Sequence, residues 1–181
     1  MTDLAVRTEG LTRRFGSFVA VDHVDLQVPR GSIYGFLGPN GAGKTTTIRM
    51  LCGLLRASGG KAEVDGVDVV RDPERIKAHV GYMSQKFSLY ADLTVDENIA
   101  FFGDVYLVPR GRLAERRAFA LQTAGLQGRE KALAGTLAVG IKQRLALGCA
   151  VLHEPRILFL DEPTAGVDPV SRRAFWRLIH G

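Results

Sequence analysis

The sequence has no uncharged apolar run long enough to cross a membrane, because such a span needs about 18 residues. Its longest uncharged stretch, 31–43, is interrupted by Pro39, Asn40 and several glycines. Arg7 and Glu9 interrupt the start of the chain, so we expect no signal peptide. Any connection with a membrane is therefore expected to come through a partner protein.

Cysteine is also scarce, with 2 residues among 181. Cys52 and Cys149 lie far apart in apolar helical contexts, and they show the spacing of neither a metal site nor a disulfide framework. We expect both side chains to be reduced thiols, as in a cytosolic protein.

Neither sign of charge dominates, since 24 Lys and Arg against 19 Asp and Glu give a net charge of +5 at pH 7. The basic excess is scattered along the chain, which favours a solvated surface over a nucleic-acid interface. A hydrophobic content of 46% and a charged content of 24% are typical of a soluble folded domain. The length suits a single domain covering residues 1–181.

Short apolar or β-branched runs alternate with helical patterns, which predicts an α/β fold with a mostly parallel core sheet. Helix starts are indicated by Asp72-Pro73, by Asp168-Pro169 and by a capping box at residues 94–97. The segment from about 86 to 150 contains helical patterns and no convincing strand, so we expect a helical subdomain inserted there. Strands are predicted near 4–8, 24–28, 31–37, 62–65, 79–83 and 157–161, and helices near 44–54, 94–107, 112–124, 139–153 and 169–180.

The strongest motif is a glycine-rich run between a predicted strand and a predicted helix. It fits a phosphate-binding loop, in which glycines let backbone N–H groups approach phosphates at the positive end of a helix. Lys44 is then expected to reach the β- and γ-phosphates, Thr45 to ligate Mg²⁺ and Thr46 to contact a phosphate. The alternative is a glycine-rich turn with a stray lysine. The expected nucleotide-binding residues are Gly38, Pro39, Asn40, Gly41, Ala42, Gly43, Lys44, Thr45 and Thr46.

A second motif is the apolar run 157–160, which is followed by Asp161 and Glu162. Ligands bind at the carboxyl ends of strands in α/β sheets, so both carboxylates are expected at such a site. Asp161 suits Mg²⁺, and Glu162 suits the orientation or deprotonation of an attacking water. Simple solvation of the strand end is the alternative.

The loop at 38–45, Gln85 and the block 160–169 together resemble the ATPase domain of ABC transporters over nearly the whole chain. The resemblance implies a P-loop fold with an N-terminal antiparallel β part, and it implies ATP and Mg²⁺ as cofactors. It assigns Phe15 to stacking on adenine, with a core phenylalanine as the alternative. It assigns Gln85 to Mg²⁺ or the attacking water, against an ordinary loop glutamine. Asp168 matches an aspartate that communicates between protomers, although capping a helix explains it equally well.

In this family each ATP lies between the loop of one protomer and a Leu-Ser-Gly-Gly-Gln sequence of the other. The corresponding residues here are Leu137, Ala138, Val139, Gly140 and Ile141. Because Ala138 lacks the serine hydroxyl, closure is expected to weaken by roughly ten- to a hundredfold. We therefore expect an impaired composite site, as in an asymmetric dimer. A variant that closes on backbone N–H groups alone is the competing explanation.

The family also continues into another core strand and a switch histidine, whereas this sequence stops at Gly181. His180 falls within the last predicted helix, so we expect it to be a surface residue. We expect the chain to be C-terminally truncated.

The resemblance is strongest to bacterial multidrug-type exporters whose ATPase and membrane parts are separate chains. It implies an ATP-hydrolysing subunit that works with a second ABC ATPase protomer and transmembrane permease subunits. It also implies a cytoplasmic protein, peripheral on the inner face of the cell membrane, with no nucleic-acid partner. The alternatives are a non-hydrolysing or degenerate-site nucleotide-binding partner and a soluble, non-transport ABC ATPase.

Overall fold

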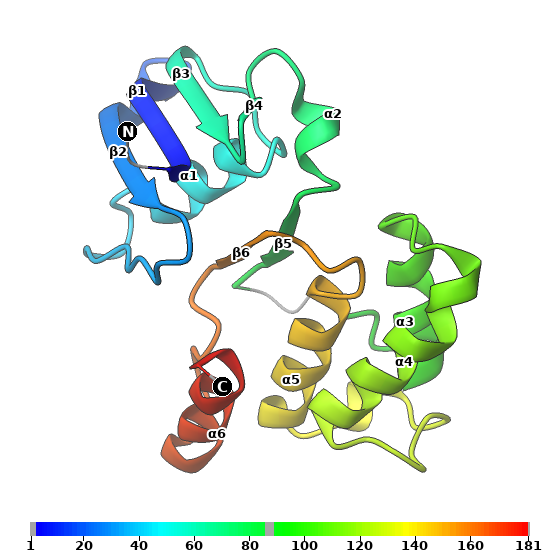
Figure 1. The fold of residues 1–181 in the computed structure, drawn as a ribbon. Coiled ribbons are helices and arrows are strands. Elements are labelled where there is room, and N and C mark those ends of the chain that lie inside the picture. Colours follow the sequence, from blue (N-terminus) through cyan, green and yellow to red (C-terminus); the bar gives the residue numbers. More distant parts are fainter. Residues whose placement is uncertain (1–2, 86–88, 181) are drawn as a thin grey trace. The chain divides into compact units, whose positions relative to one another are not determined.

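A computed structural model describes residues 3–85 and 89–180 of the chain, with only the backbone of residue 180. The expectation for the side chain of His180 therefore lies outside the described residues. The chain divides into two compact units, Met1–Val80 and Gly81–Gly181. Figure 1 shows strands and helices in both units.

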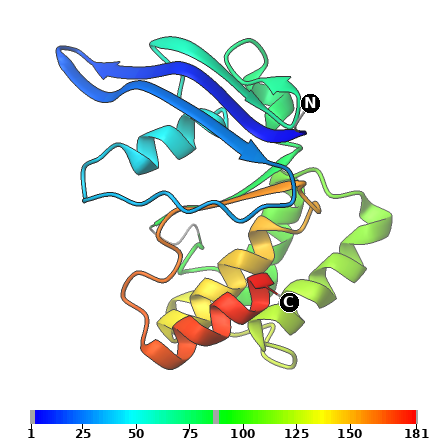
Figure 2. The same cartoon turned by 60° about the vertical axis from the view of Figure 1, so that its left-hand side comes forward.

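The first unit is built on an antiparallel sheet of four strands in the order β2-β1-β3-β4. Figure 2 shows the long hairpin of β1 and β2 with α1 beside it. Val6, Thr8 and Leu11 of β1 are buried. This sheet confirms the antiparallel β part that the family resemblance implies. The elements are β1 (Leu4–Phe15), β2 (Phe18–Pro29), α1 (Lys44–Leu51), β3 (Gly59–Val64), β4 (Val67–Asp68) and α2 (Pro73–Ile76).

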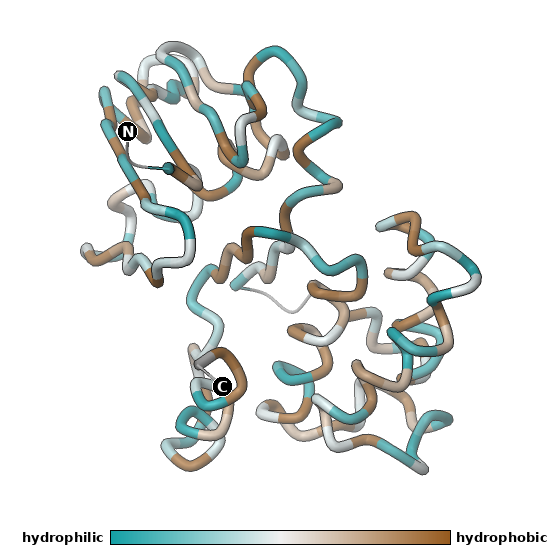
Figure 3. Tube along the Cα trace, in the orientation of Figure 1, coloured by the Kyte–Doolittle hydropathy of each residue, from teal (hydrophilic) through white to brown (hydrophobic). Residues whose placement is uncertain are grey.

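The strand predicted at 31–37 does not form, and this prediction is wrong. Residues 32–39 have no regular secondary structure, and no strand of the two described sheets pairs with them. A strand exists only where a neighbour accepts and donates its backbone hydrogen bonds, so an apolar run alone does not produce one. Ile33 is 66% exposed and Leu37 97% exposed. Figure 3 shows hydrophobic stretches, drawn in brown, in the loop that follows β2.

The second unit combines a two-stranded sheet, β5 with β6, and a group of helices. The two strands run in the same direction in Figure 1, as expected of an α/β core. Among the described residues, no helix is both long and apolar enough to span a bilayer. The elements are β5 (Val80–Met83), α3 (Val95–Val105), α4 (Arg110–Ala124), the short 3-10 helix η1 (Ala134–Thr136), α5 (Val139–Ala150), β6 (Ile157–Leu160) and α6 (Pro169–His180).

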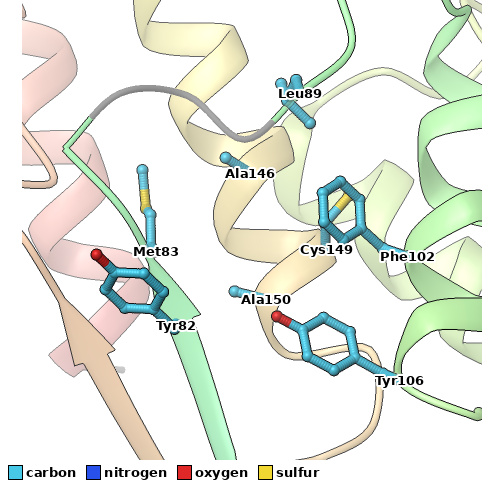
Figure 4. A pocket seen from close by; sticks show the side chains of 8 residues that line it. All are labelled: Tyr82, Met83, Leu89, Phe102, Tyr106, Ala146, Cys149 and Ala150. Carbon is cyan, nitrogen blue, oxygen red and sulfur yellow. The ribbon is translucent and has the colours of Figure 1, made fainter. Parts of the chain in front are cut away.

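Helix α5 forms the centre of this unit. Figure 4 shows Cys149 of α5 turned toward Phe102 of α3, whereas Ala146 and Ala150 lie on the side of α5 that faces Met83 of β5. The cavity between them holds only about 10 Å³, which is roughly the room of one water molecule. Burial in these surroundings raises the pKa of the Cys149 thiol to about 12, because the thiolate is poorly solvated there. Cys149 is therefore an unreactive core thiol, in accord with the sequence-based expectation.

The capping box at the start of α3 forms as predicted. The hydroxyl of Thr94 accepts a hydrogen bond from the Glu97 N–H at 3.2 Å, and the Glu97 carboxylate accepts one from the Thr94 N–H at 2.8 Å. The second bond, together with one from the Thr94 hydroxyl, holds the pKa of Glu97 below its ordinary value. Both bonds fix the point at which α3 begins.

We expect Thr94→Ala to lower the free energy of unfolding by about 1 kcal/mol, since the helix loses its side-chain cap. Chemical denaturation monitored by circular dichroism measures the change. Thr94→Ser retains the hydroxyl and serves as the control, with an expected loss of less than about half that amount. Equal losses for the two variants would show that the methyl group of Thr94, and not the cap, stabilises this region.

Candidate nucleotide-binding site

The glycine-rich loop leads directly into α1 and lies wholly in the first unit. Residues 37–41 of this segment are exposed, whereas Lys44, Thr45 and Thr46 are half-buried at the first turn of the helix. This turn has no acidic residue, and its N-cap, Gly43, makes no side-chain hydrogen bond. The positive end of the helix dipole is thus directed at the loop without a competing carboxylate, which suits an anion.

The side chain of Lys44 folds back over the loop. Its ammonium group donates hydrogen bonds to the carbonyl oxygens of Gly38 at 2.7 Å and of Pro39 at 2.8 Å. These two bonds hold the positive charge at the loop, where a phosphate oxygen is a stronger acceptor than a neutral carbonyl. Lys44 therefore lies at the loop, and its contact with phosphates stays a prediction.

Gly43 allows the loop to approach strand β2 closely. Its φ of +82° is a conformation that L residues with a side chain rarely adopt, and Gly41 has a similar φ of +83°. A Cβ atom on Gly43 would lie 2.4 Å from the carbonyl oxygen of Ala20 and 3.1 Å from Val21 Cγ2. Glycine is therefore required at this position by both backbone conformation and space.

Phe15 ends strand β1 and pairs with Phe18 across the hairpin. It is 46% exposed, so the alternative of a core phenylalanine is wrong. The guanidinium carbon of Arg13 lies 4.4 Å from the centre of the Phe15 ring. The sequence analysis did not predict this contact of Arg13 with Phe15. The two-residue spacing could have indicated it, because residues two apart on a strand share one face.

The two carboxylates follow strand β6 in the second unit. Asp161 is 2% exposed, and its N–H donates to the carbonyl oxygen of Met83 on β5 at 2.9 Å, so it extends the ladder of the two strands. Glu162 is exposed. The two neighbouring side chains are therefore placed differently, and simple solvation of a strand end does not account for the buried Asp161.

Glu162 and Gln85 are brought together, although they are far apart in sequence. The Gln85 amide nitrogen donates a hydrogen bond to a carboxylate oxygen of Glu162 at 2.8 Å. Glu162 also has a φ of +50°, an unfavourable conformation for a residue with a side chain. Such strain is common at functional sites, where the surrounding structure fixes a side-chain direction. Sequence reasoning selected both residues but gave no reason to expect this contact.

The residues that correspond to the family's signature lie at the start of α5. Ala138 is the N-cap and provides no side-chain hydrogen bond, Val139 is 45% exposed and Leu137 is buried. A Cβ atom on Gly140 would lie 2.9 Å from both Cβ and Oγ of Ser171 in α6. Gly140 thus has a packing role inside the unit, and Ser171 is the neighbour that sequence reasoning missed.

Asp168 caps helix α6, as one of its two predicted roles requires. Its carboxylate accepts hydrogen bonds from the N–H groups of Val170 at 3.0 Å and Ser171 at 2.9 Å. The hydroxyl and N–H of Ser171 hold the pKa of Asp168 below its ordinary value. Capping does not exclude a role between protomers, because the side chain stays exposed.

The residues predicted for Mg²⁺ are Thr45 in the first unit and Gln85 and Asp161 in the second. All three offer oxygen ligands, which Mg²⁺ prefers. Within residues 3–85 and 89–180, no group of three His, Cys, Asp or Glu side chains forms a metal site. Each of these side chains, taken by itself, is therefore of a type that suits Mg²⁺.

The fold and the loop define a nucleotide-binding domain of the P-loop type. The ABC transporter family model matches residues 21–165, and the chain belongs to this family. A solved structure described as the ATP binding subunit of an ABC transporter superposes with a TM-score of 0.83 and 26% identity, over 97% of this chain and 73% of that one. The predicted ABC ATPase fold is confirmed.

The relatives include drug-resistance proteins. The chain is 49% identical to the probable multidrug ABC transporter ATP-binding protein YbhF of Escherichia coli K12, over 96% of this chain and 30% of that protein. It is 40% identical to the bacitracin transport ATP-binding protein BcrA of Bacillus licheniformis, over 97% of this chain and 56% of that protein. The chain thus spans about a third to a half of the length of these relatives. They confirm the predicted resemblance to the multidrug type.

Proposed function

We propose that this chain is the ATP-binding and ATP-hydrolysing part of an ABC exporter. The observation that carries the proposal is the loop at 38–46, which presents Lys44 and the first turn of α1 to an anion without a competing carboxylate. The names of the relatives, which concern multidrug and bacitracin transport, support export as the process.

ATP fits the residues of the first unit. Phosphates would replace the carbonyl oxygens of Gly38 and Pro39 as acceptors of the Lys44 ammonium, and the loop N–H groups would donate to the same phosphates. The hydroxyl of Thr45 and the carboxylate of Asp161 would hold Mg²⁺. When bound, the ion neutralises charge on the phosphates. Thr46 adds a phosphate contact, and Phe15 offers an exposed ring to the base.

Glu162 is the residue that handles the proton in hydrolysis. Its carboxylate accepts a proton from water while the water oxygen bonds to the γ-phosphorus. The bond between that phosphorus and the bridging oxygen breaks, and ADP keeps the oxygen. Gln85 donates to Glu162 and so orients the carboxylate, which leaves the second carboxylate oxygen to accept from water.

Transport requires partners of two kinds. A second ABC ATPase protomer would close on ATP through its residues 137–140 and Asp168, and transmembrane permease subunits would carry the substrate. The chain would then work in the cytoplasm, on the inner face of the cell membrane. The helical segment from about 86 to 150 would form the subdomain next to these partners.

A degenerate-site partner in an asymmetric dimer is the second candidate, and the start of α5 favours it. Ala138 offers no hydroxyl, and Val139 has an exposed side chain at the position where the family resemblance implies a glycine. We expect Ala138→Ser combined with Val139→Gly to raise ATP hydrolysis by the complete transporter about tenfold or more, because one charge-assisted hydrogen bond is regained.

Steady-state phosphate release measures this prediction. Val139→Gly alone is the control that lacks the hydroxyl, and thermal melting of each variant measures the helix stability of about 1 kcal/mol that a serine N-cap also adds. Unchanged hydrolysis by the double variant would exclude an impaired site and would favour closure through backbone N–H groups.

The proposed function is tested with the full-length protein assembled with its membrane subunits in vesicles. We expect phosphate release from ATP that requires Mg²⁺ and stops on addition of a chelator. ATP that is bound but remains intact under both conditions would refute hydrolysis and would leave a binding module as the function.

A further inference from the structure

Arg13 and Phe15 form a pair on one face of strand β1. The guanidinium carbon of Arg13 lies 4.4 Å from the centre of the Phe15 ring. This distance is well within the range of about 6 Å at which a cation is attracted to an aromatic face.

The guanidinium is held in place from the segment that follows α1. One of its terminal nitrogens donates to the carbonyl oxygen of Arg56 at 2.8 Å, and the N–H of Arg14 donates to the Ser58 hydroxyl at 3.0 Å. The Nε atom of Arg13 is buried and has no hydrogen-bond partner among the described residues. Besides the bond to Arg56, the guanidinium therefore has the Phe15 ring as a further contact.

Phe15 remains 46% exposed although Arg13 covers one face of its ring. Part of this residue is therefore accessible to a ligand. Strand β2 links this ring to the phosphate loop, because Phe18 pairs with Phe15 and Ala20 contacts Gly43. Two residues of a strand span roughly 7 Å. The hairpin and α1 lie together in Figure 2.

We propose that Arg13 is a positioning residue for the purine base of the nucleotide, and that it acts through Phe15. This inference rests on the proposed function. A cation on one face draws the ring electrons toward itself, so the opposite face is less negative and stacks better on the π-face of a base. Because stacking does not distinguish adenine from guanine, ATP and GTP share the benefit equally.

The test measures binding of ATP, GTP and inorganic tripolyphosphate to the chain by titration calorimetry. Arg13→Met removes the charge and keeps the length of the side chain. We expect this substitution to lower the affinities for ATP and GTP by about two- to fivefold. The affinity for tripolyphosphate, which has no base, is expected to stay unchanged. Arg13→Lys retains a cation and is expected to stay within about twofold of the unsubstituted chain. Thermal melting of each variant checks folding.

A double-mutant cycle separates the possible failures. In a Phe15→Ala background, Arg13→Met is expected to have no further effect on ATP. Equal weakening of ATP and tripolyphosphate would overturn the proposal, since Arg13 would then act on the phosphates. If Arg13→Met left the affinity for ATP unchanged while Phe15→Ala lowered it, the role of Arg13 would be refuted. The proposal that the chain binds ATP would still stand. Absence of ATP binding by the unsubstituted chain would overturn both this inference and the proposed function.

Discussion

Gly43→Ala is expected to weaken ATP binding by more than about tenfold. The backbone at Gly43 has a φ of +82°, which costs a residue with a Cβ atom about 1–2 kcal/mol. The new methyl group would also lie 2.4 Å from the carbonyl oxygen of Ala20, so the loop or β2 must move. A loop displaced from its phosphate-binding geometry loses several hydrogen bonds at once, and each factor of ten corresponds to about 1.4 kcal/mol. Titration calorimetry with ATP measures the change.

Gly66→Ala is the matched control for this prediction. Gly66 has a similar φ of +76° and lies in the same unit, but a Cβ atom there would meet no atom within 4 Å. We expect it to lower the free energy of unfolding by about 1 kcal/mol and to leave ATP affinity unchanged. If Gly43→Ala behaved in the same way, the close contact with Ala20 would have no part in binding.

Glu162→Gln is expected to slow ATP hydrolysis at least about a hundredfold and to leave ATP binding within about twofold. The amide cannot take a proton from water, but its oxygen still accepts the hydrogen bond from Gln85, so the geometry is retained. Phosphate release under saturating ATP, in the complete transporter, measures turnover, and calorimetry measures affinity.

Glu154→Gln is the control, because Glu154 is also an exposed glutamate with a positive φ, here +55°. Its carboxylate pairs with Arg112 and Arg116, so its loss is expected to affect stability and not turnover. Unchanged hydrolysis in Glu162→Gln would assign the proton transfer to another group. Absence of ATP hydrolysis in the unsubstituted protein would favour the non-hydrolysing candidate.

Local patterns predicted the helices well because their start signals lie within a few residues. Thr94 and Glu97 form the predicted capping box, and Asp168 caps α6 through N–H groups two and three residues away. The phosphate loop was recognised for the same reason, since its glycines and Lys44 are contiguous. Such features depend on neighbouring residues and little on the rest of the fold.

Features that depend on distant residues escaped prediction. The segment 31–37 has the composition of a strand, but a strand needs a partner that composition does not reveal. The contact of Gln85 with Glu162 joins residues 77 positions apart, and the close approach of Gly140 to Ser171 depends on how two helices pack. Among these features, only the contact of Arg13 with Phe15 could have been predicted, because residues two apart on a strand share one face.

The most direct test of the account is the affinity of the chain for ATP when Lys44 is replaced by Met. We expect the unsubstituted chain to bind ATP. We expect Lys44→Met to lower the affinity for ATP at least about tenfold, because a charge-assisted hydrogen bond to phosphate is lost. Lys77→Met, which removes an exposed lysine paired with Glu74, is expected to change nothing. Equal affinities for the Lys44 and Lys77 variants, or no ATP binding by the unsubstituted chain, would contradict the claim that this loop binds the nucleotide.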